Sequence, residues 1–419
     1  MYDEKIIKII YVDILKHRID PKYQQATIQE LVNEKQNMIF LDNHSTTKCD
    51  LRVLKEMLPY FSEKYGNPSS SHVMGEDLIP DIELARNSIA SLINADPENI
   101  YFTNSASEAN NIVLKGIWFK NIKKHKPNEL SFISSKIEHS SVLKCIQSLA
   151  TGNYTKCKVN YVNVCSNGNL KLDDLEILLK KSNYSIVSLM AANNEIGTIN
   201  DIKYIGEICK ANQAFYHCDA VQALGKVPID VQKMDIDALT ISSHKIYGPK
   251  GIGALYLKND KMIEPLIDGG YQNTFSSGTL NVPAIIGFGK ACEILQEESK
   301  EENKRIKKLR DYLLKLLKKN IPDLHINGTM LNRLPNNLNI SIPRVLTEAF
   351  IMGIDDVMIS GGSACSSGEF EPSHVLKEIK VKYPDCAIRF GLGRWTTKKE
   401  IDYAVDKIVE IAESIRSKE

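Results

Sequence analysis

The sequence predicts an α/β fold in which a mainly parallel sheet is covered by helices, with a second, smaller domain after it. From about residue 97, short apolar runs alternate with stretches of helical periodicity. Continuous apolar strands separated by helices are typical of parallel strands that are buried on both faces. Ligands of such sheets bind beyond the carboxyl ends of the strands, so polar residues that directly follow these runs are the candidates for a site.

The elements of this sheet are expected in a fixed order along the chain. The first strand is expected at 99–103, and a helix with a serine-rich start follows it at 105–120. A strand at 129–134 with a helix at 140–150 comes next, followed by a strand at 184–191 with a helix at 202–212. Three further strands are expected at 214–218, 238–242 and 251–257. This alternation is the pattern of helices that cross between parallel strands.

The C-terminal part of the chain is expected to form the smaller domain. A long segment rich in Lys, Glu and Leu, at roughly 282–319, predicts a helix that bridges to it. Its predicted contents are the apolar segments 336–342 and 387–393 and a closing helix from about Lys398. We place the large domain at 38–290, with room for its first residues to pack on the small domain, and the small domain at 291–419.

Residues 1–37 are expected to form a separate N-terminal extension with helical character. The segment 27–30, "TIQE", has the form of a capping box. The first twenty residues carry four acidic side chains and no uninterrupted apolar core, whereas transit peptides are poor in acidic residues. We therefore expect this extension to remain part of the protein, and we favour a packing arm over a dedicated partner-binding element.

Composition excludes several classes of function. The chain has 419 residues with a net charge of +1, which gives no global argument for binding nucleic acid or an anionic membrane surface. No apolar run approaches the length of a membrane span. The nine cysteines are scattered as singles without C-x-x-C spacing, so reduced thiols in a cytosol-like compartment are favoured over a disulfide framework.

Three polar positions follow successive predicted strands. Lys245 comes just after 238–242, where burial would lower the pKa of its amine toward that of a nucleophile, although a surface lysine in a turn is an alternative. Asp219 ends another apolar strand, where it could hold a protonated pyridine nitrogen or simply cap a helix. Ser105 and Ser107 begin the helix at 105–120, and a helix N-terminus binds phosphate well, although serine is also a common cap. Together, the three positions describe a pyridoxal-phosphate site.

The sequence also resembles a known family through motifs that run in family order from about Ile39 to the C-terminus. The matching segments are "LDNHSTT", "YGNPSSSH", "FTNSASEANN", "EHSSVL", "NNEIGTI", "HCDAVQALGKVPID", "SSHKIYGPKGIGALY", "SGTLNVP", "GSACSSGEFEPSHVL" and "IRFGLGRWTT". The two that contain Lys245 and Cys365 are highly specific. In these motifs the chain is similar to cysteine desulfurases, in the class V aminotransferase family of fold-type-I pyridoxal-phosphate enzymes. The resemblance implies an α/β large domain and a smaller α+β domain. The loop around Cys365 resembles the iron–sulfur-cluster and nitrogen-fixation branch.

The resemblance implies a role for each matched residue. Lys245 would bind pyridoxal 5'-phosphate covalently, Asp219 would pair with its pyridinium nitrogen, and His139 would stack on its ring and assist proton transfer. The remaining cofactor contacts implied are Asn194 and Gln222 near the phenolic oxygen, Ala106, Ser107, Ser242 and His244 at the phosphate, and Thr279 reaching the phosphate from the partner subunit of a homodimer with shared active sites.

The same resemblance implies a substrate and a reaction. Arg389, together with Asn194, would bind L-cysteine through its carboxylate, a geometry suited to a guanidinium group. Cys365 would take the substrate sulfur as a persulfide, with release of L-alanine. Its Gly/Ser-rich loop would then carry the sulfur to an iron–sulfur scaffold or a sulfur-carrier protein, for cluster assembly or tRNA thiolation. The implied enzyme is cytoplasmic, with no metal and no direct contact with nucleic acid or membrane.

Alternatives remain at this point. A selenocysteine lyase or cysteine sulfinate desulfinase is disfavoured by the length of the Cys365 loop, and a catalytically degenerate sulfur-transfer scaffold is disfavoured because the matched residues are all present. His139 could instead be a capping residue, and Arg389 a structural ion pair. The chain also departs from the family at Asn273 and Ser276, where basic residues are expected. These neutral residues put in doubt the electrostatics near the dimer-side phosphate contact.

Overall fold

The computed structural model describes residues 38–124, 129–151, 157–269, 275–361 and 372–417. The predictions for residues 1–37, Asn273 and Cys365 therefore lie outside the described residues. Among the helices that are described, none combines the length and the apolar character needed to cross a membrane.

A seven-stranded sheet forms the centre of the larger part of the molecule, with strand order β2-β8-β7-β6-β5-β3-β4. Its strands are β2 (Ile100–Thr103), β3 (Leu130–Ser135), β4 (Lys158–Val162), β5 (Tyr184–Ser188), β6 (Phe215–Asp219), β7 (Ala238–Ser242) and β8 (Gly253–Leu257). Only β8 among these strands runs antiparallel to its neighbours, β2 and β7. The prediction of a mainly parallel sheet in an α/β fold is confirmed.

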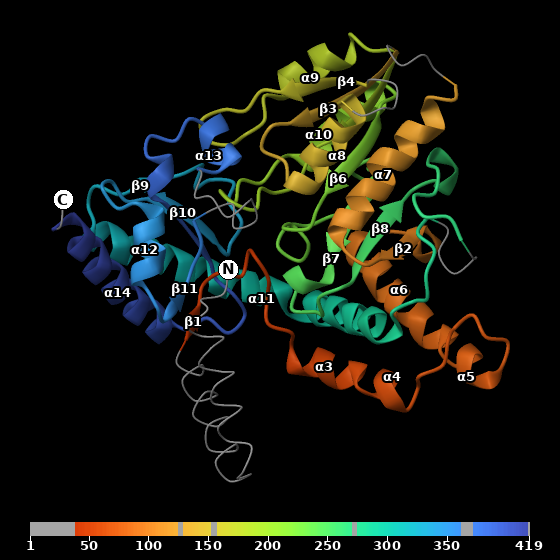
Figure 1. Ribbon diagram of the computed structural model, residues 1–419, viewed down its shortest axis with the longest axis horizontal. Helices are drawn as coiled ribbons and strands as arrows, with labels where there is room; N and C mark the ends of the chain where they lie inside the picture. Colours follow the sequence, from red (N-terminus) through yellow and green to blue (C-terminus); the bar gives the residue numbers. More distant parts are fainter. Residues whose placement is uncertain (1–37, 125–128, 152–156, 270–274, 362–371, 418–419) are drawn as a thin grey trace, which may run out of the picture.

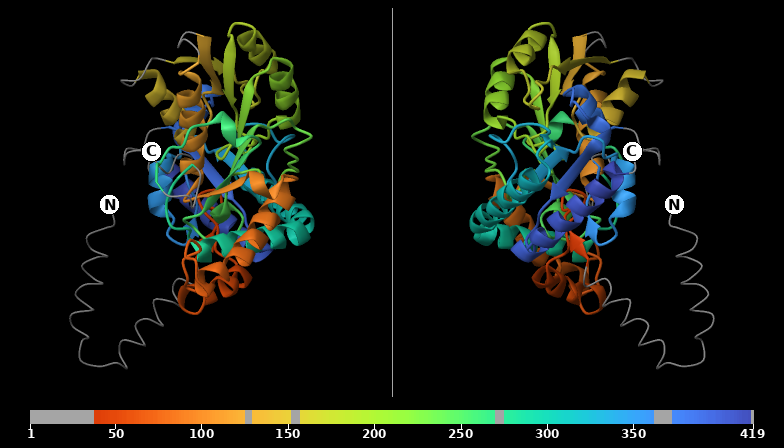
Figure 2. Two further views of the ribbon diagram at one scale, coloured as in Figure 1. Left: turned by 90° about the vertical axis from the view of Figure 1, so that its right-hand side faces the viewer. Right: turned by 90° about the vertical axis from the view of Figure 1, so that its left-hand side faces the viewer.

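Helices cover both faces of this sheet, as Figures 1 and 2 show. The helices of this part of the molecule are α3 (Leu51–Met57), α4 (Pro59–Ser62), α5 (Val73–Glu76), α6 (Ile79–Ile93), α7 (Ala106–Asn121), α8 (Ser140–Thr151), α9 (Leu172–Leu179) and α10 (Ile202–Ala211), of which α3, α4 and α5 lie away from the sheet (Figure 1). Neighbouring strand residues belong to two different hydrophobic clusters: Phe132 shares a cluster with residues of α7 and α8, whereas Ile133 shares one with residues of α6 and α10. This division follows from the two-residue repeat of a strand, and it explains why the strands are apolar throughout.

The C-terminal part is built on two small sheets. One has the antiparallel order β12-β10-β9, and the other is the parallel pair of β1 and β11. Its elements are β1 (Ile39–Phe40), β9 (His325–Ile326), β10 (Asn337–Ser341), α12 (Thr347–Gly353), β11 (Val357–Met358), α13 (His374–Glu378), β12 (Ala387–Gly391) and α14 (Lys398–Arg416). Ile39 and Leu41 belong to the hydrophobic core of this part rather than to that of the large sheet.

Helix α11 (Val282–Asn320) connects the two parts (Figure 1). Its 39 residues span roughly 58 Å at 1.5 Å per residue. Its first half contributes Phe288 and Leu295 to the core beneath the large sheet, and its second half contributes Leu313 and Leu317 to the small core. The domain limits at 38–290 and 291–419 stay predictions.

Candidate active site

The polar residues predicted from the strand ends lie together at the carboxyl edge of the parallel strands. Asp219 is the last residue of β6, and Lys245 lies in the short 3₁₀ turn that follows β7. Strands β6 and β7 are adjacent and parallel, so their carboxyl ends meet at one edge of the sheet. A carboxylate and an amine therefore follow two neighbouring strands at the same edge of the sheet.

Lys245 is held by a neighbouring segment of backbone. Its Nζ donates hydrogen bonds of 2.6 Å to the carbonyl oxygens of His44 and Ser45. Thr47 joins the same two segments, because its Oγ1 donates to the His244 carbonyl and accepts from the Tyr247 N–H. The turn that carries the lysine is thereby fixed against residues 44–47.

Asp219 is buried and connected to His139 through two polar side chains. One of its carboxylate oxygens accepts a hydrogen bond of 3.0 Å from Asn110 Nδ2, and the other accepts from the Val221 N–H. Asn110 also donates to Ser141 Oγ at 2.9 Å, and that hydroxyl lies 2.8 Å from His139 Nδ1. The hydrogen bond from the Val221 N–H is the local contact expected if Asp219 only caps a turn. The carboxylate is in addition linked to His139 through Asn110 and Ser141.

Electrostatics keeps the imidazole of His139 neutral. Burial lowers its pKa and the positive charge of Lys245 adds to this effect, while Asp219 acts in the opposite direction. His244 behaves similarly, because burial and the lysines at 245 and 250 lower its pKa to about 4. A neutral ring can stack on an aromatic ligand and can accept a proton, which are the roles proposed for His139.

The start of α7 lies beside strand β8 and close to the lysine turn. Ser105 is the N-cap, and its Oγ accepts from the Glu108 N–H. A Cβ built on Gly253 would lie 2.9 Å from the Ser105 carbonyl carbon and 3.0 Å from the Ala106 nitrogen, so this glycine allows the helix start to approach the strand. The first N–H groups of a helix have no partner within the helix and favour an anion.

The remaining predicted residues occupy varied environments. Gln222 and Ser242 are buried, Asn194 is half-buried, and Ser107 and Thr279 are exposed. Ser276, one of the two departures from the family pattern, is buried, and its hydroxyl donates to the Glu108 carboxylate at the start of α7. A neutral residue there keeps this carboxylate hydrogen-bonded without adding a positive charge.

Arg389 is buried on β12 and forms an ion pair. Its Nη2 lies 2.9 Å from Asp42, and its Nη1 donates to the Asn194 carbonyl oxygen at 3.2 Å. Its Nε has no hydrogen-bond partner within the described part of the chain. The structural ion pair considered as the alternative role of Arg389 is therefore present. The Asp42 carboxylate also offsets the cost of burying the guanidinium charge.

Sequence reasoning missed three residues of this arrangement. Asp42 and His44 lie in the "LDNHSTT" motif but received no role, and Asn110 lies one turn beyond the start of α7. The signal for Asn110 is a polar residue with no exposed surface on an otherwise apolar helix face.

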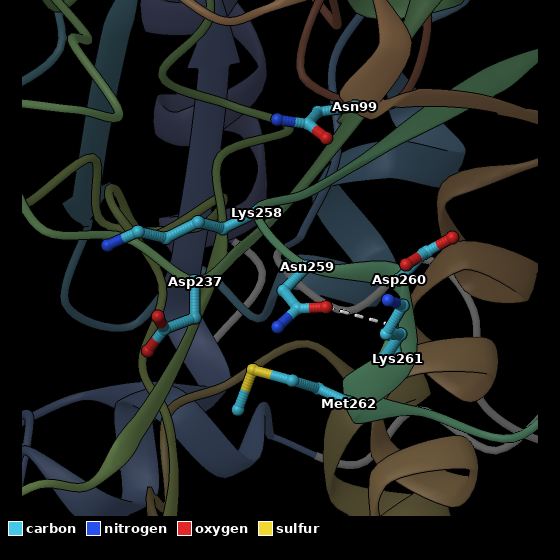
Figure 3. A pocket seen from close by; sticks show the side chains of 7 residues that line it. All are labelled: Asn99, Asp237, Lys258, Asn259, Asp260, Lys261 and Met262. Carbon is cyan, nitrogen blue, oxygen red and sulfur yellow. Dashed lines mark hydrogen bonds between the residues drawn. The ribbon is translucent and has the colours of Figure 1, made fainter.

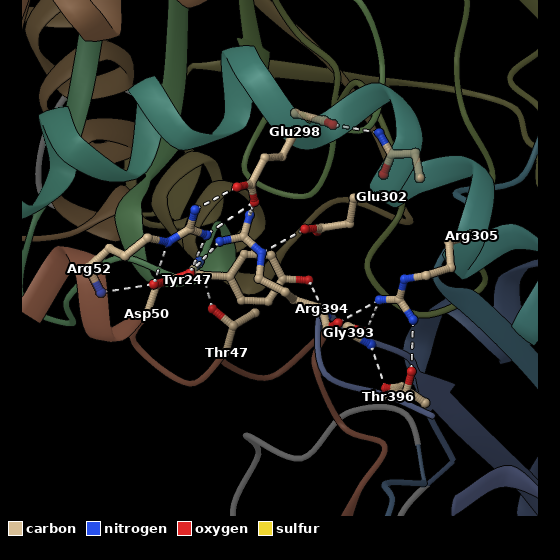
Figure 4. Close-up of polar contacts among 12 residues, drawn as sticks. Thr47, Asp50, Arg52, Tyr247, Glu298, Glu302, Arg305, Gly393, Arg394 and Thr396 are labelled. Carbon is tan, nitrogen blue, oxygen red and sulfur yellow. Dashed lines mark hydrogen bonds and ion pairs between the residues drawn. The ribbon is translucent and has the colours of Figure 1, made fainter. Parts of the chain in front are cut away.

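A network of ion pairs lies on the outer side of the lysine turn (Figure 4). Arg394 donates to Asp50 and to Glu302, both at 2.6 Å, and its guanidinium lies 4.3 Å from the centre of the Tyr247 ring. Arg52 joins the network through Asp50. It ties together residues 47–52, helix α11 and the segment after β12.

A separate hollow lies at the amino-terminal ends of the parallel strands of the large sheet (Figure 3). Its lining includes Asp237, just before β7, Asn99, just before β2, and Lys258, just after β8. Because these residues are at the opposite ends of the strands from Asp219 and Lys245, this hollow is not part of the site.

The residues at the carboxyl edge fit pyridoxal phosphate. An amine, a buried carboxylate, a neutral imidazole and a helix N-terminus converge there, and the buried Asn110 Oδ1 and Ser243 Oγ have no protein partner among the residues described. A doubly wound sheet with this set of groups defines the class of fold-type-I pyridoxal-phosphate enzymes.

Comparison with known proteins gives the family. The model of the aminotransferase class-V family matches residues 39–404. The chain is 43% identical over 385 residues to a protein named cysteine desulfurase IscS from Ehrlichia chaffeensis, covering 90% of this chain and 92% of that one. A solved structure titled NifS-like protein superposes with a TM-score of 0.83 at 36% identity, covering 90% of this chain and 100% of that one. Another, titled SspA in complex with cysteine, gives a TM-score of 0.71 at 29% identity, covering 86% and 100%. The chain belongs to the aminotransferase class-V family, and within it to the cysteine desulfurases.

Proposed function

We propose that this enzyme converts L-cysteine to L-alanine and holds the removed sulfur as a persulfide on Cys365. The observation that carries the proposal is the position of Lys245, Asp219 and His139 at one edge of the sheet, where contacts through Asn110 and Ser141 join Asp219 to His139. Lys245, Asp219 and His139 would hold the cofactor, with the N-terminus of α7 at its phosphate.

The chemistry divides between the cofactor and the chain. Pyridoxal phosphate, when bound, supplies an electron sink for the bonds at the substrate α-carbon. Asp219 would stabilise a positive charge on the pyridine nitrogen of the cofactor, because its carboxylate is buried and oriented by Asn110. Lys245 moves a proton at the α-carbon, and the carbonyl oxygens of His44 and Ser45 give its amine a defined resting position.

Arg389 is proposed to bind the substrate carboxylate. It already shares its charge with Asp42, and its Nε is a buried donor that lacks a partner in the described part of the protein. A carboxylate ligand would satisfy that donor with a charge-assisted hydrogen bond. Asn194, whose carbonyl oxygen accepts from the same guanidinium, would line the same end of the site.

Sulfur transfer needs a thiol and no external oxidant. The Cys365 thiolate attacks the substrate sulfur, an S–S bond forms, and the C–S bond breaks with its electron pair going to the carbon that becomes the alanine methyl group. Cys365 lies outside the described residues, so its role is supported by the surrounding motif. The persulfide would then pass to an iron–sulfur scaffold or a sulfur carrier. Cys145, Cys209, Cys218 and Cys292 are buried free thiols, which suits a reducing compartment such as the cytoplasm.

A homodimer is supported by an exposed apolar surface on α3 to α6. Its large exposed side chains are Leu51 (70%), Leu58 (55%), Phe61 (62%), Val73 (65%) and Leu84 (64%). Large exposed apolar side chains on successive helices are typical of an interaction surface, and we propose that a second copy of the chain covers them. Sedimentation analysis should show a dimer for the native chain and a monomer for Leu58→Glu/Phe61→Glu, and a native monomer would contradict this.

The activity itself is tested with the purified, cofactor-loaded protein. It should release alanine from L-cysteine in equal amount to sulfide when a thiol reductant is present. Alanine release from L-selenocysteine or cysteine sulfinate without any from L-cysteine would redirect the assignment to the neighbouring activities. A cofactor-loaded protein with no turnover of any of the three would indicate a scaffold.

A further inference from the structure

His44 is a buried histidine that lies between the large sheet and strand β10 of the small domain. It belongs to the segment between β1 and α3, and only 2% of its surface is exposed. Its Nδ1 lies 3.0 Å from Gln222 Oε1, and its Nε2 lies 3.1 Å from Asn337 Nδ2. The ring thus joins a residue after β6 to a residue on β10.

The surrounding amides fix which ring nitrogen carries the proton. Asn337 Oδ1 accepts from Arg333 Nη1 at 3.1 Å, so its Nδ2 must point the other way and donate to His44 Nε2. Gln222 Nε2 donates to the His44 carbonyl oxygen at 3.1 Å, so its Oε1 faces the ring and accepts from Nδ1. Both assignments give the same neutral imidazole, protonated on Nδ1.

The charges around the ring preserve this state. Burial holds the pKa of His44 well below its usual range, and the positive charges of Arg389, Lys226 and Lys245 lower it further, against the opposing hydrogen bond of Gln222. A second proton on Nε2 would face the NH₂ group of Asn337, which is a donor, and that contact would be repulsive.

His44 also contacts the lysine through its backbone. Its carbonyl oxygen accepts from Lys245 Nζ at 2.6 Å and from Gln222 Nε2 at 3.1 Å. Gly391 lets strand β12 approach this residue closely, because a Cβ at that position would lie 2.7 Å from the His44 backbone nitrogen and 2.8 Å from its Cδ2. One residue therefore sets the position of Gln222, of the lysine amine and of the adjoining strand of the small domain.

We propose that His44 is a positioning residue, which orients Gln222 toward the phenolic oxygen of the cofactor and couples that orientation to Asn337 on β10. The inference rests on the proposed function, because the contact between Gln222 and the cofactor is part of it. His44 does not touch the reacting atoms in this scheme. Its effect reaches them through Gln222 and through the carbonyl oxygen that holds Lys245.

The experiment compares His44→Leu, His44→Gln and the control His325→Leu in the cofactor-loaded protein. Leucine can neither donate to Gln222 nor accept from Asn337, whereas glutamine can do both. His325 lies on β9, where its ring contacts Tyr383, so its replacement removes a histidine away from the site. The readouts are the dissociation constant of pyridoxal phosphate and the pH at which its visible absorption band titrates.

We expect His44→Leu to weaken cofactor binding roughly tenfold, the cost of leaving buried hydrogen-bonding groups without partners. We also expect a displaced titration of the absorption band, because the phenolic oxygen would lose an oriented neighbour. His44→Gln should recover most of both properties, and His325→Leu should match the native protein. Native values for His44→Leu would overturn the inference, whereas failure of the native protein to bind the cofactor would overturn the proposed function instead.

Two further measurements keep the inference testable if His44→Leu does not fold. ¹⁵N NMR of the native holoenzyme should show His44 neutral and protonated on Nδ1 across pH 6–8, and a ring protonated on Nε2 alone would contradict the assignment. A double-mutant cycle of His44→Ala with Asn337→Ala should show coupling between the two residues in cofactor affinity, because each substitution removes one side of the hydrogen bond. Additive effects of the two substitutions would mean that the ring does not connect β10 to the site.

Discussion

Replacing Arg394 by methionine should destabilise the protein far more than the same replacement at a surface ion pair. The Arg394 guanidinium contacts Asp50 and Glu302 at 2.6 Å, and the side chains of these partners are only 6% and 11% exposed. Removing one partner of a buried ion pair costs about 3–5 kcal/mol. Here Glu302 would lose its guanidinium partner while buried, and Asp50 would keep only Arg52. Loss of the contact between Arg394 and the Tyr247 ring acts in the same direction.

The matched control is Arg416→Met. Arg416 pairs with Asp323 at 2.9 Å, but these side chains are 20% and 47% exposed. Exposed pairs contribute about 0–1 kcal/mol. Urea denaturation followed by circular dichroism should therefore give a large loss of unfolding free energy for Arg394→Met and a small one for Arg416→Met. Equal losses would refute the reasoning, since both substitutions remove the same chemical group.

The pH dependence provides a second check on the same network. Hydrogen bonds from Arg52, with a further one from Arg394, hold the pKa of Asp50 well below its ordinary value of 3.8. A depressed pKa in the folded state means that the stabilisation is present above the unfolded value and is lost as the pH falls toward the folded value. Arg394→Met should weaken this acid sensitivity without abolishing it, because Arg52 remains. Unchanged acid unfolding in the variant would show that Arg394 contributes nothing to the carboxylate.

Three other substitutions test the site, and a fourth tests the pKa of the buried carboxyl of Glu138. Lys245→Ala should abolish turnover and the borohydride-reducible bond to the cofactor, and a reducible bond in the variant would exclude Lys245. Asp219→Asn should retain cofactor but lose most activity, as measured by alanine release, because an amide cannot stabilise the pyridinium charge; near-native rates would leave Asp219 only its local turn. Cys365→Ser should keep the cofactor spectrum while alanine release falls to background, and mass spectrometry of the native protein should find added sulfur on the peptide containing Cys365 rather than Cys218 or Cys386. Burial raises the pKa of Glu138 from 4.5 to about 8, so its contribution to stability is lost as the pH rises between these values. Glu138→Gln should therefore flatten the decline of the unfolding free energy over that pH range. An unchanged slope would contradict a raised pKa of Glu138.

The strands and the residues that end them could be predicted because their signals are local. Apolar runs marked β5, β6 and β7, and Asp219 and Lys245 were recognised as polar residues at strand ends. Strand β4 was not predicted, because it is an edge strand with exposed Lys158 and a polar Asn160, which interrupt the apolar pattern. The antiparallel direction of β8 has no local signal either, since a buried strand is apolar in both directions.

The contacts that complete the site could not be predicted, because they join residues far apart in the chain. Arg389 is separated from Asp42 by 347 residues, and His44 from Asn337 by 293. Composition and spacing give no information about such pairs, and a histidine in a loop motif reveals neither its burial nor its tautomer. The individual site roles therefore stay predictions to be tested by substitution.

The pairing of β1 with β11 has a consequence for how the protein is made. Ile39 aligns with Val357, and Ile39 and Leu41 belong to the core completed by residues of β12 and α14. At about 5–20 residues per second, a ribosome needs on the order of 15–60 s to reach the partner of Ile39 after synthesising it. During that interval the large sheet can form, whereas the apolar start of β1 has no native partner. Nascent chains should therefore expose this segment to chaperones until the last part of translation, and the small core should be the last to become resistant to protease.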